Sequence, residues 1–72
     1  MNEDGLIAIT LDGKPHAVPA RTNLAVLVES LGYAPNEVST AVNGLFVARG
    51  QREACQLQTG NAVLLFQPIV GG

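Results

Sequence analysis

The residues of this 72-residue chain that could take part in chemistry lie mainly at its C-terminal end. The chain ends on Gly71 and Gly72, which follow the segment Gln67-Pro68-Ile69-Val70. Glycine has no Cβ, so a diglycine terminus can enter a passage too narrow for other residues and leaves the terminal carboxyl open on both sides. Chain ends also commonly fray. The terminus is therefore either a plain tail or a segment that presents its carboxyl to a reaction.

Other reactive residue types are isolated along the chain. Cys55 is the single cysteine, which excludes an internal disulfide and a metal site built from cysteines. Arg49 and Arg52 are close to it in sequence but no histidine is, so we expect a small, partly buried structural thiol. His16 has no acid or nucleophile at a useful spacing and is expected on the surface. Asp12 is one carboxylate and cannot hold a metal alone, so no metal site is predicted.

The composition indicates one small domain over residues 1–72, with residues 1–5 frayed and 67–72 flexible. Hydrophobic residues make up 47% of the chain and charged residues 14%, with a net charge of −2. The four basic residues are spread along the chain, which argues against a nucleic-acid interface. No apolar run is long enough to span a membrane, and the acidic N-terminus is unlike a signal peptide. We therefore expect a cytoplasmic protein.

A β-hairpin is predicted near the N-terminus. The run Leu6–Leu11 alternates with period two, which is typical of a strand with one buried face. Asp12-Gly13 then favours a type I′ turn, which needs positive φ at both central residues. The second strand should cover roughly His16–Pro19. Because Pro15 and Pro19 cannot donate to a neighbouring strand, we expect this strand to be short and at an edge.

One amphipathic helix is predicted after the hairpin. Thr22 is the expected N-cap, its hydroxyl accepting from an unpaired backbone N–H. Apolar residues then follow at i, i+3, i+4 and i+7, namely Leu24, Leu27, Val28 and Leu31. Gly32 should end the helix in a left-handed conformation, and Pro35 prevents its restart.

The rest of the chain is predicted to be mostly extended. Two short strands, 40–43 and 45–48, flank the turn Asn43-Gly44, and residues 50–56 are polar and irregular, with Cys55 and Leu57 able to pack inward. The turn 59–61 leads into a last strand that reaches Phe66. A helix with one apolar stripe must cover one face of the sheet. We therefore predict an α+β fold, with a single mixed sheet against one main helix and the last strand beside the first.

The last strand has two apolar faces, although a sheet covered on one side should have one polar face. We assign Val63 and Leu65 to the core, together with Ile7, Ile9 and Leu11. Leu64 and Phe66 should then be exposed, joined by Phe46 or Leu45. An exposed apolar patch beside the tail favours a partner-docking surface. The alternatives are a loop that covers this face or a dimer formed through it.

Arg49 and Arg52 have two interpretations. They could lie near the docking surface and pair with acidic groups of a partner, or they could be solvated surface residues.

The order and spacing of these pieces resemble the ubiquitin-like β-grasp fold, and specifically the ThiS family of bacterial sulfur carriers. The resemblance covers nearly the whole chain from Ile7 onward. Its matching segments are Asp12-Gly13, Thr22–Leu31, Ala41-Val42-Asn43-Gly44 with Val47 and Arg49, Val63–Gln67, and Gly71-Gly72. One departure is Thr59-Gly60-Asn61, where family members commonly carry Asp-Gly-Asp. Asn still suits a turn, but negative charge that a partner could read is lost.

The resemblance implies that the chain is a protein substrate and not an enzyme, and that it binds no cofactor of its own. A ThiF-type adenylating enzyme would use ATP and Mg²⁺ to activate the Gly72 carboxylate. A sulfur-donor protein would then supply the sulfur of a thiocarboxylate, which passes to a thiazole synthase of the ThiG type. The tail that carries Gly72 into the enzyme consists of Pro68, Ile69, Val70 and Gly71.

Three other functions remain open from the sequence. The related carrier of molybdopterin synthase shares the fold and the diglycine, although it tends to be longer and has Pro-Pro where this chain has Gln67-Pro68. A ubiquitin-like modifier conjugated to lysines would need the same tail. A β-grasp binding module with an inert tail is the last possibility.

Overall fold

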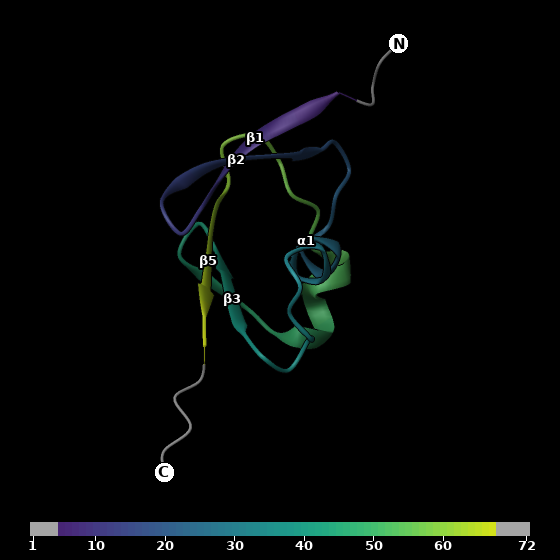
Figure 1. The fold of residues 1–72 in the computed structure, drawn as a ribbon, viewed down its shortest axis with the longest axis vertical. Helices are drawn as coiled ribbons and strands as arrows, with labels where there is room; N and C mark the ends of the chain where they lie inside the picture. The colour runs from purple at the N-terminus through teal and green to yellow at the C-terminus, as the bar shows by residue number, and fades with distance from the viewer. Residues whose placement is uncertain (1–4, 68–72) are drawn as a thin grey trace.

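The computed structural model describes residues 5–67, which form a mixed five-stranded sheet with a main helix against it (Figure 1). The strand order is β2-β1-β5-β3-β4, with β1 and β5 parallel and the other pairs antiparallel. The predicted α+β fold is confirmed, as is the position of the last strand beside the first. The elements in chain order are β1 (Leu6–Leu11), β2 (Lys14–Pro19), α1 (Leu24–Ser30), β3 (Ser39–Val42), β4 (Leu45–Val47), the 3₁₀ helix η1 (Arg49–Ala54) and β5 (Ala62–Phe66).

The β1–β2 hairpin turns at Asp12 and Gly13, as predicted. Their φ angles are 52° and 84°, so both residues have the positive φ that a type I′ turn needs. Asp12 also binds β5, because its N–H donates to the Val63 carbonyl at 2.9 Å and its carboxylate accepts from the Leu65 N–H at 3.1 Å. The turn therefore helps to hold β5 beside β1. β2 begins at Lys14, earlier than predicted, and lies at the edge that its prolines require.

The helix α1 is capped by Asn23, and the predicted Thr22 cap is wrong. The Asn23 side chain accepts from the Val26 N–H at 2.8 Å. The Thr22 hydroxyl donates instead to the Pro19 carbonyl, at 2.6 Å, and so is directed back toward β2. Gly32, at φ 92°, follows the end of the helix as expected. Within residues 5–67, no helix is long and apolar enough to cross a membrane.

The core lies between the sheet and α1, which sits on the same side of the sheet as η1 (Figure 1). Its buried members come from β1, β2, α1, β5 and the segment after η1, and they are Ile9, Val18, Leu24, Leu27, Leu57 and Val63. Leu65, Ile7 and Leu11 pack against this cluster and are partly buried. The core assignment of Val63 and Leu65 is therefore confirmed.

Two tight turns position the later strands. Asn43 and Gly44 have φ angles of 53° and 82° between β3 and β4, and Gly60 has φ 90° before β5. The Asn61 side-chain oxygen accepts from the Gln58 N–H at 2.7 Å and closes this second turn. Asn61 therefore preserves the turn although it lacks a carboxylate.

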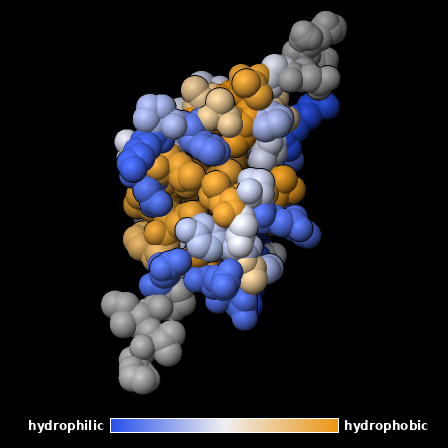
Figure 2. All heavy atoms as spheres, in the orientation of Figure 1, coloured by the Kyte–Doolittle hydropathy of each residue, from blue (hydrophilic) through white to orange (hydrophobic). Residues whose placement is uncertain are grey.

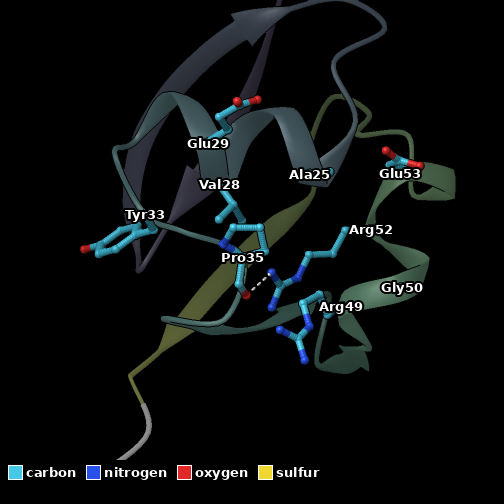
Figure 3. A pocket seen from close by; sticks show the side chains of 9 residues that line it. All are labelled: Ala25, Val28, Glu29, Tyr33, Pro35, Arg49, Gly50, Arg52 and Glu53. Carbon is cyan, nitrogen blue, oxygen red and sulfur yellow. Dashed lines mark hydrogen bonds between the residues drawn. The ribbon is translucent and has the colours of Figure 1, made fainter.

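Residues 49–54 form the 3₁₀ helix η1 and are not irregular as predicted. Arg52 is only 3% exposed, so the two expectations for it, a solvated residue or a partner contact, are wrong. Its guanidinium donates to the Thr40 hydroxyl at 3.1 Å and to the Val38 carbonyl at 2.6 Å. It also donates to the Pro35 carbonyl at 2.9 Å, the bond drawn as a dashed line in Figure 3. Burial, and secondarily the charge of Arg49, lower the pKa of Arg52. Its role is to join η1, β3 and the loop after α1.

Candidate docking face

Three large apolar side chains lie on the face of the sheet turned away from α1. Ala41 on β3 pairs with Leu64 on one side and with Phe46 on the other. Phe66 pairs with Ser39, two positions along β3 on the same face. Directly paired residues point to the same side of a sheet, so these side chains are neighbours on it. We call Phe46, Leu64 and Phe66 the outer apolar face.

These three side chains are exposed. The exposed fractions are 70% for Phe46, 50% for Phe66 and 37% for Leu64, which confirms the predicted exposure of all three. No segment within residues 5–67 therefore covers this face. Figure 2 shows apolar side chains reaching the outline of the molecule on the β5 side, away from α1. Full burial of one such side chain contributes about 2 kcal/mol. Covering the whole patch would therefore contribute substantially to the free energy of binding a partner.

Two other exposed leucines lie apart from the outer apolar face. Leu45 is 72% exposed, but it pairs with Val42, which in turn pairs with the buried Val63. The predicted grouping of Leu45 with Leu64 is therefore wrong, because its side chain belongs to the helix side of the sheet. Leu6, at 70% exposure, was not predicted as a surface residue. It shares the outer side but lies at the far end of β1, about 25 Å from Phe66 at roughly 3.3 Å per strand position.

The outer apolar face lies directly before the C-terminal tail. β5 ends at Phe66, and Gln67 is the last residue that the structure describes. Gly72 is six residues beyond Phe66, so an extended chain could carry its carboxyl at most about 20 Å from that side chain. The predicted site of modification and its tail lie outside the described residues; they are Pro68, Ile69, Val70, Gly71 and Gly72.

The remaining candidate residues are structural in this fold. Cys55 is half-buried and packs against the core, and Leu57 is buried, as predicted. His16 pairs with Ile9 and is half-buried, so it is less exposed than expected. Within residues 5–67, no three His, Cys, Asp or Glu side chains are close enough together to hold a metal ion.

Comparison with known proteins links this arrangement to a family. The model of the ThiS family matches residues 8–72. A crystal structure of the thiamine biosynthesis protein ThiS from Geobacter metallireducens superposes with a TM-score of 0.79 and 28% identity, covering 92% of this chain and all of that one. A solution structure of a thiamine biosynthesis protein from the same organism gives a TM-score of 0.72 and 29% identity, over 92% of this chain and 87% of that one.

A curated relative is much longer than this chain. A thiazole synthase from Magnetococcus marinus is 38% identical over 64 residues, which are 89% of this chain and 20% of that protein. The chain therefore spans about one fifth of the length of this relative.

Proposed function

The chain belongs to the ThiS family, the sulfur carriers of thiamine biosynthesis, and from that premise we propose that its Gly72 carboxylate carries sulfur to a thiazole synthase. In this proposal the chain is a protein substrate, and its partners supply the catalytic groups. The cytoplasm, where thiols stay reduced, is the expected compartment.

The proposed reaction begins with activation of the carboxylate. A terminal carboxyl has a reference pKa of about 3.3–3.7, so it is ionised at neutral pH and is a poor electrophile. A ThiF-type adenylating enzyme uses ATP and Mg²⁺: a carboxylate oxygen attacks the α-phosphorus and pyrophosphate leaves. The terminal sulfur of a persulfide on a donor protein then attacks the acyl carbon and displaces AMP. Reduction of the resulting S–S bond by a thiol leaves the thiocarboxylate on Gly72.

The observation that carries this proposal is the outer apolar face at the end of β5. A partner that covers Phe46, Leu64 and Phe66 needs a reach of at most about 20 Å to accept the terminal carboxyl. Gly71 and Gly72 have no side chains that could block entry of the carboxyl into an active site, and a proline at position 68 disfavours a helical conformation of the preceding Gln67. The folded body thus supplies binding energy, and the tail supplies the reacting group.

The relative from Magnetococcus marinus supports the choice of acceptor. A segment similar to this chain occurs within a longer protein named thiazole synthase. Two activities joined in one chain commonly act on the same reaction path, so a thiazole synthase of the ThiG type is the proposed sulfur acceptor.

Intact-mass measurement tests the proposal. The chain is incubated with a ThiF-type adenylating enzyme, ATP, Mg²⁺, a persulfide donor and a thiol. The expected product is heavier by the difference between sulfur and oxygen, and it loses this mass when a thiazole synthase and its substrates are added. Transfer to molybdopterin synthase alone would favour the carrier of that enzyme, an isopeptide bond to lysine would favour a modifier, and an unchanged mass would favour a binding module with an inert tail.

The variant Gly72→Ala separates the tail from the body in the same assay. The added Cβ would crowd the reacting carboxyl carbon in the active site of the adenylating enzyme, so we expect a sharp loss of acyl-adenylate. The free energy of unfolding should be unchanged. Acyl-adenylate formation at the normal rate would contradict the proposed role of Gly72.

A further inference from the structure

A second surface lies on the helix side of the sheet, where α1 and η1 face each other (Figure 3). A hollow of about 430 Å³ is lined there by Ala25 and Val28 of α1, by Pro35, and by Arg49 and Arg52 of η1, among others. A smaller hollow of about 270 Å³ shares Pro35, Arg49 and Arg52 with it. We call the two hollows together the Arg49 groove.

The centre of the Arg49 groove carries two guanidinium groups. The Arg52 guanidinium is occupied by its two carbonyl acceptors and the Thr40 hydroxyl. Arg49 is exposed, and it has no hydrogen bond or ion pair to any of the residues 5–67. Figure 3 shows the two guanidinium groups next to each other, with Glu29 and Glu53 at the outer walls. The larger hollow thus has carboxylates as well as arginines in its lining, whereas the residues that line the smaller hollow include both arginines and no carboxylate. The positive charge is concentrated where the two hollows meet, at Arg49 and Arg52.

The walls beside these charges are partly apolar. Ala25, Val28 and Pro35 line the larger hollow, and Val38 and Phe46 line the smaller one. Phe46 also belongs to the outer apolar face, so the Arg49 groove continues around the β4 edge onto that face. A macromolecule that covers the outer apolar face could therefore reach the groove without leaving the surface.

We propose that the Arg49 groove binds an acidic segment of a partner protein. A carboxylate of that segment accepts from the Arg49 guanidinium, whose planar N–H fork matches carboxylate geometry. An adjacent apolar side chain of the segment packs against Val28 and Pro35. The carboxylate also offsets the repulsion between the two arginines. Binding at the groove depends on its charges and shape and is independent of the proposed sulfur chemistry.

The net negative charge of the chain should confine binding of an acidic segment to the few places where cations lie together. With a net charge of −2, the chain as a whole repels an acidic partner. Attraction is confined to places where cations lie together, and Arg49 and Arg52 form such a place in the fold. Lys14 lies on β2, at the opposite edge of the sheet from β4.

An NMR titration tests the proposal directly. The ¹⁵N-labelled chain is titrated with the blocked peptide Ac-Glu-Leu-Asp-Leu-Glu-NH₂ and, as a matched neutral probe, with Ac-Gln-Leu-Asn-Leu-Gln-NH₂. We expect saturable shifts at the backbone amides of Val28 and Gly50 and at the Arg49 Nε–H with the acidic peptide. The neutral peptide should bind more weakly by about fivefold or more.

Matched variants locate the effect. Arg49→Gln removes an exposed charge and should weaken binding of the acidic peptide by about fivefold. Lys14→Gln changes the net charge equally at the opposite edge and should leave the affinity unchanged. The proposal would be overturned if no saturable shift occurred in the groove, or if both peptides bound with the same affinity. It would also be overturned if Arg49→Gln bound the acidic peptide as tightly as the unmodified chain, or if Lys14→Gln lost as much affinity as Arg49→Gln. Thiocarboxylate formation is measured separately, so failure here would leave the sulfur-carrier function standing.

Discussion

The two sides of β5 carry the same kind of residue in opposite environments. Val63 is completely buried and Leu65 partly so, against the core formed with α1. Leu64 and Phe66, which alternate with them, are exposed on the other side of the same strand. The strand β5 therefore has one apolar side that packs into the core and a second apolar side that the described residues leave uncovered.

Within the five residues of β5, the buried side chains therefore serve stability and the exposed side chains are available for recognition. A polar residue at Leu64 or Phe66 would fit an exposed sheet face without loss of the core. Apolar side chains at these positions add little to the fold, but they offer a partner area from which water can be released. The inner side of β5 should therefore control unfolding, and the outer side should control binding.

The largest expected effect follows a change on the outer side. Phe66→Asp puts a charge where a partner is proposed to exclude water, and loss of an aromatic anchor costs about 3 kcal/mol, or about 100-fold in kcat/KM for adenylation. Pyrophosphate release by a ThiF-type adenylating enzyme measures this ratio. The free energy of unfolding should change by less than about 1 kcal/mol, because the position is exposed.

Leu45→Asp provides the control for this experiment. Leu45 is even more exposed than Phe66, but its register places it on the other side of the sheet. Its kcat/KM should stay near that of the unmodified chain. An equal loss in both variants would mean that exposed apolar residues in general, and not the outer apolar face, set the rate.

The next effect concerns the inner side. Val63→Ala removes two buried methyl groups and should lower the free energy of unfolding by about 2–3 kcal/mol. Leu64→Ala removes a larger group from the exposed side and should cost less than about 1 kcal/mol. Urea denaturation followed by circular dichroism compares the two. Equal losses would contradict the division of β5 into two sides.

Substitutions of the two neighbouring arginines should differ in their effect on the free energy of unfolding by about 2 kcal/mol. Arg52→Met leaves the carbonyls of Pro35 and Val38 without their donor, at a cost of about 2 kcal/mol. Arg49→Met loses no hydrogen bond within residues 5–67 and should change stability by at most about 0.5 kcal/mol. Thermal unfolding of both variants shows whether the buried guanidinium is structural. A small loss in Arg52→Met would instead assign it a role outside the fold.

The smallest effect concerns the helix that covers Val63. Asn23→Ala removes the side chain that accepts from the Val26 N–H and should cost about 1 kcal/mol. Thr22→Ala loses an exposed hydrogen bond to the Pro19 carbonyl and should cost about 0.5 kcal/mol. Chemical denaturation ranks the two. The reverse order would mean that Thr22 is the more important residue at the start of α1.

Local patterns in the sequence were sufficient to predict most of the fold. The turns at Asp12-Gly13 and Asn43-Gly44 depend on backbone conformations that few residue types adopt, so they could be identified from the residues alone. The helix and the two sides of β5 follow from periodicity. The N-cap was misplaced by one residue, because Thr22 and Asn23 both suit the position and only the direction of the chain leaving β2 decides between them.

The role of Arg52 could not be predicted, because it depends on contacts distant in sequence. Its three acceptors lie 12 to 17 residues away, and no local pattern brings them together. The position of Leu45 was missed for a related reason. Its side of the sheet is fixed by the register with β3, which one residue of difference in the turn would reverse.

Cross-saturation NMR tests the central claim most directly. The deuterated, methyl-labelled chain is mixed with a protonated ThiF-type adenylating enzyme, and saturation of the enzyme attenuates signals of the carrier at the contact. The Leu64 methyl groups should lose intensity strongly, while those of Val63 and Leu27 in the core keep theirs. Attenuation limited to the helix side of the sheet, with the Leu64 methyl groups unaffected, would contradict the assignment of the outer apolar face as the docking surface.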